Sequence, residues 1–75
     1  MHNQQEAKNI EIIMYNIDAV DMTQVSVEAE IELALAMNKA AQLDLTCLDL
    51  GNPKIKQRVD ELKTHYQTAM NLIQQ

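Results

Sequence analysis

The middle of the chain has an ambiguous pattern of apolar and polar positions. In the segment VSVEAEIELALAM, residues 25–37, every odd position is apolar and the even positions begin Ser, Glu, Glu, Glu. Alternation is typical of a half-buried strand, but Glu, Ala, Leu and Met favour a helix. No second strand is evident that could pair with this one, so we interpret the segment as part of a helix over about residues 24–50. Alternate residues of a helix point to nearly opposite sides, so this helix is apolar on two sides and needs two neighbours.

Two apolar seams with heptad-like spacing run along this predicted helix. The first has no polar member, and the second has one polar member, Asn38. The members of the first seam are Ala29, Leu33, Ala36, Ala40, Leu43, Cys47 and Leu50. The members of the second are Val27, Ile31, Ala34, Asn38, Ala41, Leu45 and Leu48.

The only glycine and the only proline of the chain stand together in LGNPK, residues 50–54. Gly51 is placed to end a helix in the left-handed conformation, while Asn52 can cap the next helix and Pro53 suits its first turn. The following residues predict a helix over 53–74 from the seam Ile55, Val59, Leu62, Tyr66, Ala69 and Ile73. A turn this short makes the two helices an antiparallel hairpin.

The register of the hairpin depends on which seam of the middle helix packs on the last helix. We favour the second seam, because it places Asn38 opposite Tyr66, where the amide and the hydroxyl would satisfy each other. The first seam matches almost as well with a slight shift of the turn, so both registers stay open.

The N-terminal segment predicts a shorter helix over about residues 4–18, with Ile10, Ile13, Met14 and Ile17 on one side. Residues 1–5 could form a flexible N-terminus, and Asp21, Thr23 or Ser26 could cap the next helix. The sequence therefore predicts one small all-α domain over residues 1–75. It consists of an antiparallel helical hairpin, about 24–50 and 53–74, with an additional short N-terminal helix.

Charge and composition exclude several classes of function. Eleven acidic residues against six basic ones give a net charge of −5, which disfavours nucleic acid and anionic membranes as partners. The sequence shows no secretory signal and no apolar run of transmembrane length. A single cysteine, Cys47, cannot form an internal disulfide. We therefore expect a cytoplasmic protein.

No residue pattern predicts catalysis, a metal site or a cofactor. Glu28, Glu30 and Glu32 spread around a helix surface instead of converging. Glu61 and His65 are one turn apart and could share a proton or a metal ion, but zinc needs three or four ligands and no further pair joins them. Cys47, on an apolar seam, is expected to be buried. The expectation is a protein that is not an enzyme and has no cofactor.

The surplus of apolar surface predicts an interaction with another protein or with a second copy of the chain. The first hypothesis is a helical protein–protein interaction module that buries a partner helix. The alternative is a self-assembling, homo-oligomeric coiled-coil subunit. The residues expected to contact the partner are Ile10, Ile13, Met14, Ile17, Leu33, Ala36, Ala40 and Leu43.

The stretch from EIELALAMNKAAQLDL to GNPKIKQRVDELKTHYQTAMNLIQQ, about residues 30–75, resembles the small helical-hairpin co-chaperones of type III secretion needle subunits. The shared features are a helix opening Glu-hydrophobic-Glu-Leu-Ala-Leu, a turn that contains Gly, and a second helix ending in Ala-Met and Leu-Ile. The resemblance implies a small chaperone that works with a second chaperone to keep a needle subunit soluble. The N-terminal segment departs from that pattern.

Overall fold

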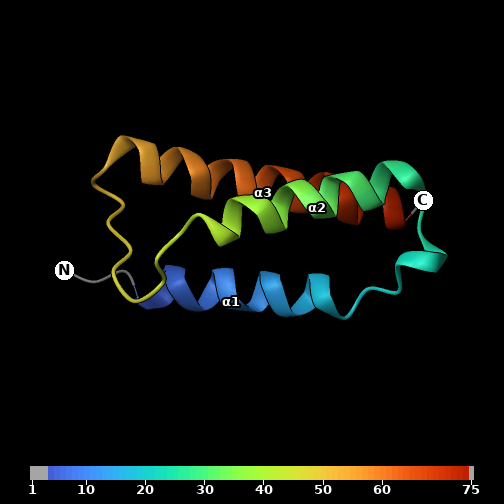
Figure 1. Cartoon of the computed structure of the whole chain (residues 1–75), viewed down its shortest axis with the longest axis horizontal. Helices are drawn as coiled ribbons and strands as arrows, with labels where there is room; N and C mark the ends of the chain where they lie inside the picture. The colour runs from blue at the N-terminus through green and yellow to red at the C-terminus, as the bar shows by residue number, and fades with distance from the viewer. Residues whose placement is uncertain (1–3, 75) are drawn as a thin grey trace.

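The computed structural model describes residues 4–74, which form three α-helices and one 3-10 turn. The helices are α1 (Gln4–Asp18), α2 (Val27–Ala41) and α3 (Pro53–Ile73), and the 3-10 turn spans Met22–Gln24. In Figure 1, α1 and α3 run from left to right and α2 runs from right to left, so α1 and α3 are parallel and α2 is antiparallel to both. The predicted all-α fold, a helical hairpin with a short N-terminal helix, is confirmed. Of the predicted flexible N-terminus, residues 1–3 lie outside the described residues, and Gln4 and Gln5 belong to α1.

Each hairpin helix starts at a predicted capping residue, and of the three candidates for α2 it is Ser26, so α2 begins at Val27 instead of about residue 24. The Ser26 hydroxyl accepts a hydrogen bond from the Ala29 amide, 3.1 Å away, and so caps α2. The Asn52 side chain accepts from the Lys54 amide at 3.0 Å, and Pro53 follows it in the first turn of α3. Each cap satisfies an amide that has no partner within its own helix, so these starts are fixed locally.

The predicted extension of the middle helix to residue 50 is wrong, because α2 ends at Ala41. The Asp44 carboxylate accepts hydrogen bonds from the amide and the hydroxyl of Thr46, at 3.0 and 2.6 Å. Such short polar side chains offer the backbone an alternative to the helix. Asp21 makes the same two bonds to Thr23 before α2, again at 3.0 and 2.6 Å. The same Asp-x-Thr turn therefore stands on both sides of α2.

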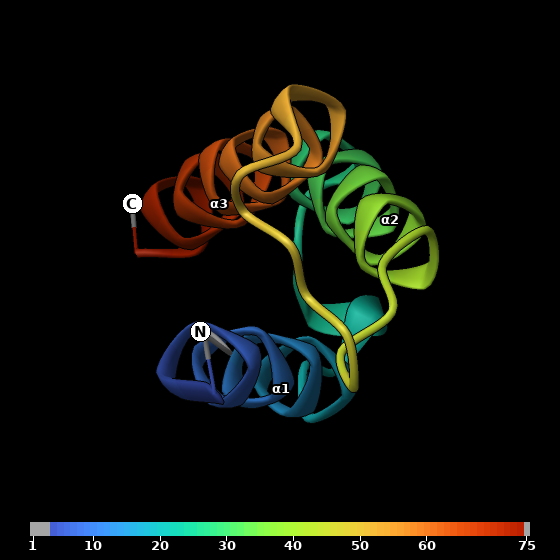
Figure 2. The same cartoon turned by 90° about the vertical axis from the view of Figure 1, so that its left-hand side faces the viewer.

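Residues 42–52 form a connection that covers one end of the bundle. It descends from the end of α2 towards the start of α1 and then rises to α3 (Figures 1 and 2). Leu48 is buried in the core, and Leu43, Leu45 and Leu50 pack against it. Cys47, which was expected to be buried, is exposed. The apolar residues of this stretch thus fill the core from a loop instead of from a helix.

Gly51 does not have the left-handed conformation that was expected of it. Its amide donates to Asp49 Oδ1 at 3.0 Å, and a Cβ atom at this position would lie 3.1 Å from the same oxygen. A side chain at this position would therefore require the exposed Asp49 carboxylate to shift by a few tenths of an ångström.

The core contains the first seam of α2, so the register favoured from the sequence is wrong. Ala29, Leu33, Ala36 and Ala40 are buried, whereas Asn38 is exposed and accepts a hydrogen bond from the Gln42 amide group at 2.9 Å. The physical reason is that the first seam has no polar member, so its burial leaves no polar group without water. The largest fully buried side chains are Ile10, Leu33 and Leu62, one from each helix.

Helix α1 lies farther from the hairpin helices than these lie from each other (Figure 2). Its apolar side, with Ile10 and Ile17 buried, faces the shared core. At its edges the Asn16 amide group donates to the Tyr66 hydroxyl at 3.1 Å, and Glu6 forms an ion pair with Lys63 at 2.6 Å. The polar partner of Tyr66 is therefore on α1, and not Asn38 as predicted.

Truncation of Leu33 should destabilise the fold, while the same change two residues away should not. Leu33→Ala removes a fully buried side chain and should lower the free energy of unfolding by about 2–5 kcal/mol. Leu35→Ala, at a side chain that is 41% exposed, should cost no more than about 1 kcal/mol. Urea unfolding followed by circular dichroism measures both. Equal decreases in the free energy of unfolding for the two variants would contradict the burial of the Leu33 side of α2.

The Asp44 turn should make part of the stability depend on pH. The Thr46 hydroxyl and then the Thr46 amide donate to the carboxylate and hold the pKa of Asp44 below its ordinary value of 3.8. The stabilisation is therefore fully present above pH 3.8 and is lost as the pH falls through the lower pKa of the folded state. Near neutral pH, wild type should have a higher melting temperature than Asp44→Asn. This difference in melting temperature should disappear in acid. Glu11→Gln, at an exposed carboxylate, serves as the control; a gap that does not change with pH would contradict the account.

Candidate protein-binding surface

One side of α2 exposes three large aliphatic residues in a line. Val27, Ile31 and Leu35 are spaced four residues apart and are 70%, 54% and 41% exposed. They lie opposite the buried seam, because the two sets are separated by about half a turn of helix. We call Val27, Ile31 and Leu35, together with Leu72 of α3, the outer face.

The outer face borders a shallow, open hollow between α2 and α3. The hollow has a volume of about 360 Å³, with Ile31 and Leu72 as its apolar walls and Glu28, Glu32 and Thr68 as its polar ones. A second hollow, of about 340 Å³, lies between α2 and the end of α1 and is lined by Ile17, Met22 and Glu30 among others. The exposed line of α2 therefore has a depression on each side.

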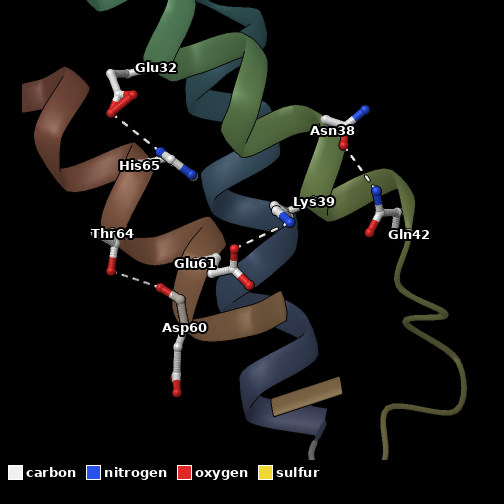
Figure 3. A network of polar contacts seen from close by, with 8 residues as sticks. All are labelled: Glu32, Asn38, Lys39, Gln42, Asp60, Glu61, Thr64 and His65. Atoms are coloured by element: carbon white, nitrogen blue, oxygen red, sulfur yellow. Dashed lines mark hydrogen bonds and ion pairs between the residues drawn. The ribbon is translucent and has the colours of Figure 1, made fainter. Parts of the chain in front are cut away.

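Two polar contacts join α2 to α3 beside the core (Figure 3). His65 Nδ1 lies 3.3 Å from Glu32 Oε1, and Lys39 Nζ lies 3.3 Å from Glu61 Oε2. Glu61 and His65 thus each face a residue of α2 instead of sharing a proton or a metal ion. Within residues 4–74 no group of three His, Cys, Asp or Glu side chains could hold a metal ion.

Acidic residues gather at the end of the bundle that carries the outer face. Residues 9–38 and 64–74 contain six carboxylates and no Lys or Arg. These residues include the end of the bundle where α1 finishes, α2 starts and α3 finishes, and they also extend along most of α1 and α2 (Figure 1). The chain's six bases and its other five acids all lie in residues 4–8 and 39–63. The carboxylates of the acidic end are Glu11, Asp18, Asp21, Glu28, Glu30 and Glu32.

The eight residues predicted to contact a partner lie inside the single chain. Five of them are buried, namely Ile10, Ile17, Leu33, Ala36 and Ala40. The other three, Ile13, Met14 and Leu43, are half-buried and pack against the same core. In this structure α1 covers the seam of α2 within one chain, so a partner can reach the five buried residues only if α1 leaves it.

Sequence reasoning did not assign the outer face to the partner, although one signal was available. Val27 and Ile31 head the second seam, which was expected to pack on the last helix. Once the all-apolar seam is taken by the core, these residues are left outside, because they lie on the opposite side of the same helix. Leu35 and Leu72 belong to none of the seams predicted from the sequence, and only the fold brings them to the outer face.

Among residues 4–74, no helix has both the length and the apolar composition needed to cross a bilayer. Comparisons of the chain with protein-family models, with curated proteins and with solved structures gave no match.

The two contacts between α2 and α3 should matter for stability only slightly. Their side chains remain partly exposed, and ion pairs of this kind contribute up to about 1 kcal/mol each. Glu61→Gln and His65→Ala should each lower the free energy of unfolding by no more than about this amount. Both variants should still bind whatever wild type binds, as measured by co-purification. Loss of binding in a folded His65→Ala variant would contradict a purely structural role.

Proposed function

We propose that the chain is a non-enzymatic helical interaction module, a small chaperone or adaptor that binds a helix of another protein along its outer face. The observation that carries the proposal is the exposed line of Val27, Ile31 and Leu35 on α2. The opposite side of this helix is already buried in the core of the chain. Burial of apolar side chains against a partner contributes about 25 cal/mol per Å² before the costs of association.

The core of the single chain does not use these side chains. Ile10, Leu33 and Leu62 are fully excluded from solvent without any contribution from the outer face. Single exposed aliphatic residues are ordinary on protein surfaces, but a contiguous apolar line beside a hollow is typical of interaction sites. A helix laid along α2 would cover Val27, Ile31 and Leu35 together, because they span about 12 Å of the helix axis.

The resemblance of residues 30–75 to co-chaperones of type III secretion needle subunits supports the same kind of role. Those proteins are helical hairpins, and α2 and α3 form such a hairpin here. The specific proposal is a cytoplasmic co-chaperone that, with a second chaperone, keeps an aggregation-prone helical subunit soluble. Self-assembly through the outer face is the competing outcome, which the experiment below distinguishes.

A pair of matched variants tests the function. Ile31→Asp places a charge in the outer face, whereas Ile12→Asp makes the same change on α1 at a nearly equal exposure, 56% against 54%. Tagged versions of both and of wild type are incubated with extract of the native host, and captured proteins are identified by mass spectrometry. A partner that binds wild type and Ile12→Asp should bind Ile31→Asp about 30-fold or more weakly. Substitution of a residue at the centre of an interface typically causes a loss of this size.

Two other results would contradict the proposal. A partner that binds Ile31→Asp as tightly as wild type uses a different surface. A concentration-dependent increase of mass in sedimentation, abolished by Ile31→Asp and not by Ile12→Asp, would show that the outer face joins copies of the chain instead.

A further inference from the structure

We infer that the partner of the outer face is an amphipathic helix whose apolar stripe is flanked by Lys or Arg side chains. This inference rests on the function proposed above and adds the chemistry of the partner to it. Two observations lead to it: the placement of carboxylates around the outer face, and the lack of ion pairs between these carboxylates and any Lys or Arg of residues 4–74.

Carboxylates flank the exposed line of α2 on both sides. At 100° per residue, Glu28 and Glu32 lie on the side of the line that faces α3, and Glu30 lies on the other side. Glu28 and Glu32 accordingly line the hollow between α2 and α3, whereas Glu30 lines the hollow towards α1. A helix that covered the line would therefore bring both of its flanks next to negative charge.

The chain itself does little to offset this charge. Among residues 4–74, Glu28 and Glu30 have no ion-pair partner, and the only cationic group beside Glu32 is His65, when it is protonated. The two lysines whose ion pairs join different helices, Lys39 and Lys63, hold Glu61 and Glu6. The carboxylates around the outer face are therefore free to pair with cations of a partner, and opposite charges at the rim of an interface select partners and speed their approach.

A second copy of the chain is a poor occupant for the same reason. Two outer faces brought together would place the Glu28, Glu30 and Glu32 side chains of both copies around one apolar contact. The start of α3 is basic, with Lys54, Lys56 and Arg58, but it offers no exposed large aliphatic side chain, since Ile55 packs against its own core. Neither a symmetric contact between outer faces nor a contact of the outer face with the start of α3 combines apolar and charge complementarity.

Three synthetic helical peptides test the inference. They share one stripe of Leu and Ala residues and differ only in the flanking positions, which are all Lys, all Gln or all Glu. Binding to wild type is measured by fluorescence anisotropy at low salt and at high salt. Wild type should bind the Lys peptide at least about tenfold more tightly than the Gln peptide and should not bind the Glu peptide. High salt should reduce the preference for Lys, because it screens exposed charges.

Variants separate the charge from the apolar contact. In the triple variant Glu28→Gln, Glu30→Gln, Glu32→Gln, the Lys and Gln peptides should bind alike, while the Gln peptide should bind as it does to wild type. Ile31→Asp should lose the Gln peptide, and Ile12→Asp should retain wild-type binding of all three. Circular dichroism of each variant establishes that it is folded.

The results distinguish failure of this inference from failure of the proposed function. If the Gln peptide binds wild type as tightly as the Lys peptide, the outer face binds helices but does not select basic ones, and only the inference is overturned. If no peptide binds, or if Ile31→Asp binds them all unchanged, the outer face is not a site for helices and both proposals are overturned.

Discussion

The burial of one narrow side of α2 is the interaction on which the rest of the structure depends. Three of its four members are alanines, Ala29, Ala36 and Ala40, and these small side chains let a neighbouring helix come close. The fourth, Leu33, is fully buried and belongs to the same core cluster as Ile10 of α1 and Leu62 of α3. Because α2 is apolar on two opposite sides, the choice of this side for the core decides what remains outside. If α2 were rotated by half a turn, the Asn38 amide would be buried and lose its contact with water, and Leu33 would be exposed. Packing of the opposite side of α2 into the core is therefore disfavoured.

The connection of residues 42–52 shows how a short chain completes such a core. A bundle of three short helices leaves its ends open, and a domain of this size buries a smaller fraction of its surface than a larger one does. Here four leucines of the connection cover one end, and Leu48 is buried in the core. The polar groups of the same stretch are satisfied locally, since Asp44 and Asp49 accept hydrogen bonds from the backbone just after them. The connection therefore contributes apolar side chains to the core without forming a helix or strand. With this end of the core covered, α1 can pack against it.

The helix starts and the fold class were predictable from the sequence, because Ser26, Asn52 and Pro53 act through local hydrogen bonds and backbone geometry. The end of α2 was not predicted, because the apolar spacing continues through Leu43 and Leu50 although the helix does not. The Asp-x-Thr pattern of the turn at Asp21, before α2, recurs at Asp44, and it carried the missing information. The outer face was missed for a different reason. An apolar seam is the same signal whether it is covered by the chain's own helix or by another protein, and only the packing of α1 distinguishes the two.

The uneven placement of charge gives the molecule an electric dipole along its long axis. The carboxylates of residues 9–38 form the negative pole, and the backbone adds to it. Two helices, α1 and α3, finish at this end and one, α2, starts there (Figure 1). A helix terminates in a partial negative charge and begins with a partial positive one, so one uncompensated helix dipole points the same way as the side-chain charges. A cationic molecule diffusing nearby is consequently turned and drawn towards one pole of the bundle before any contact forms.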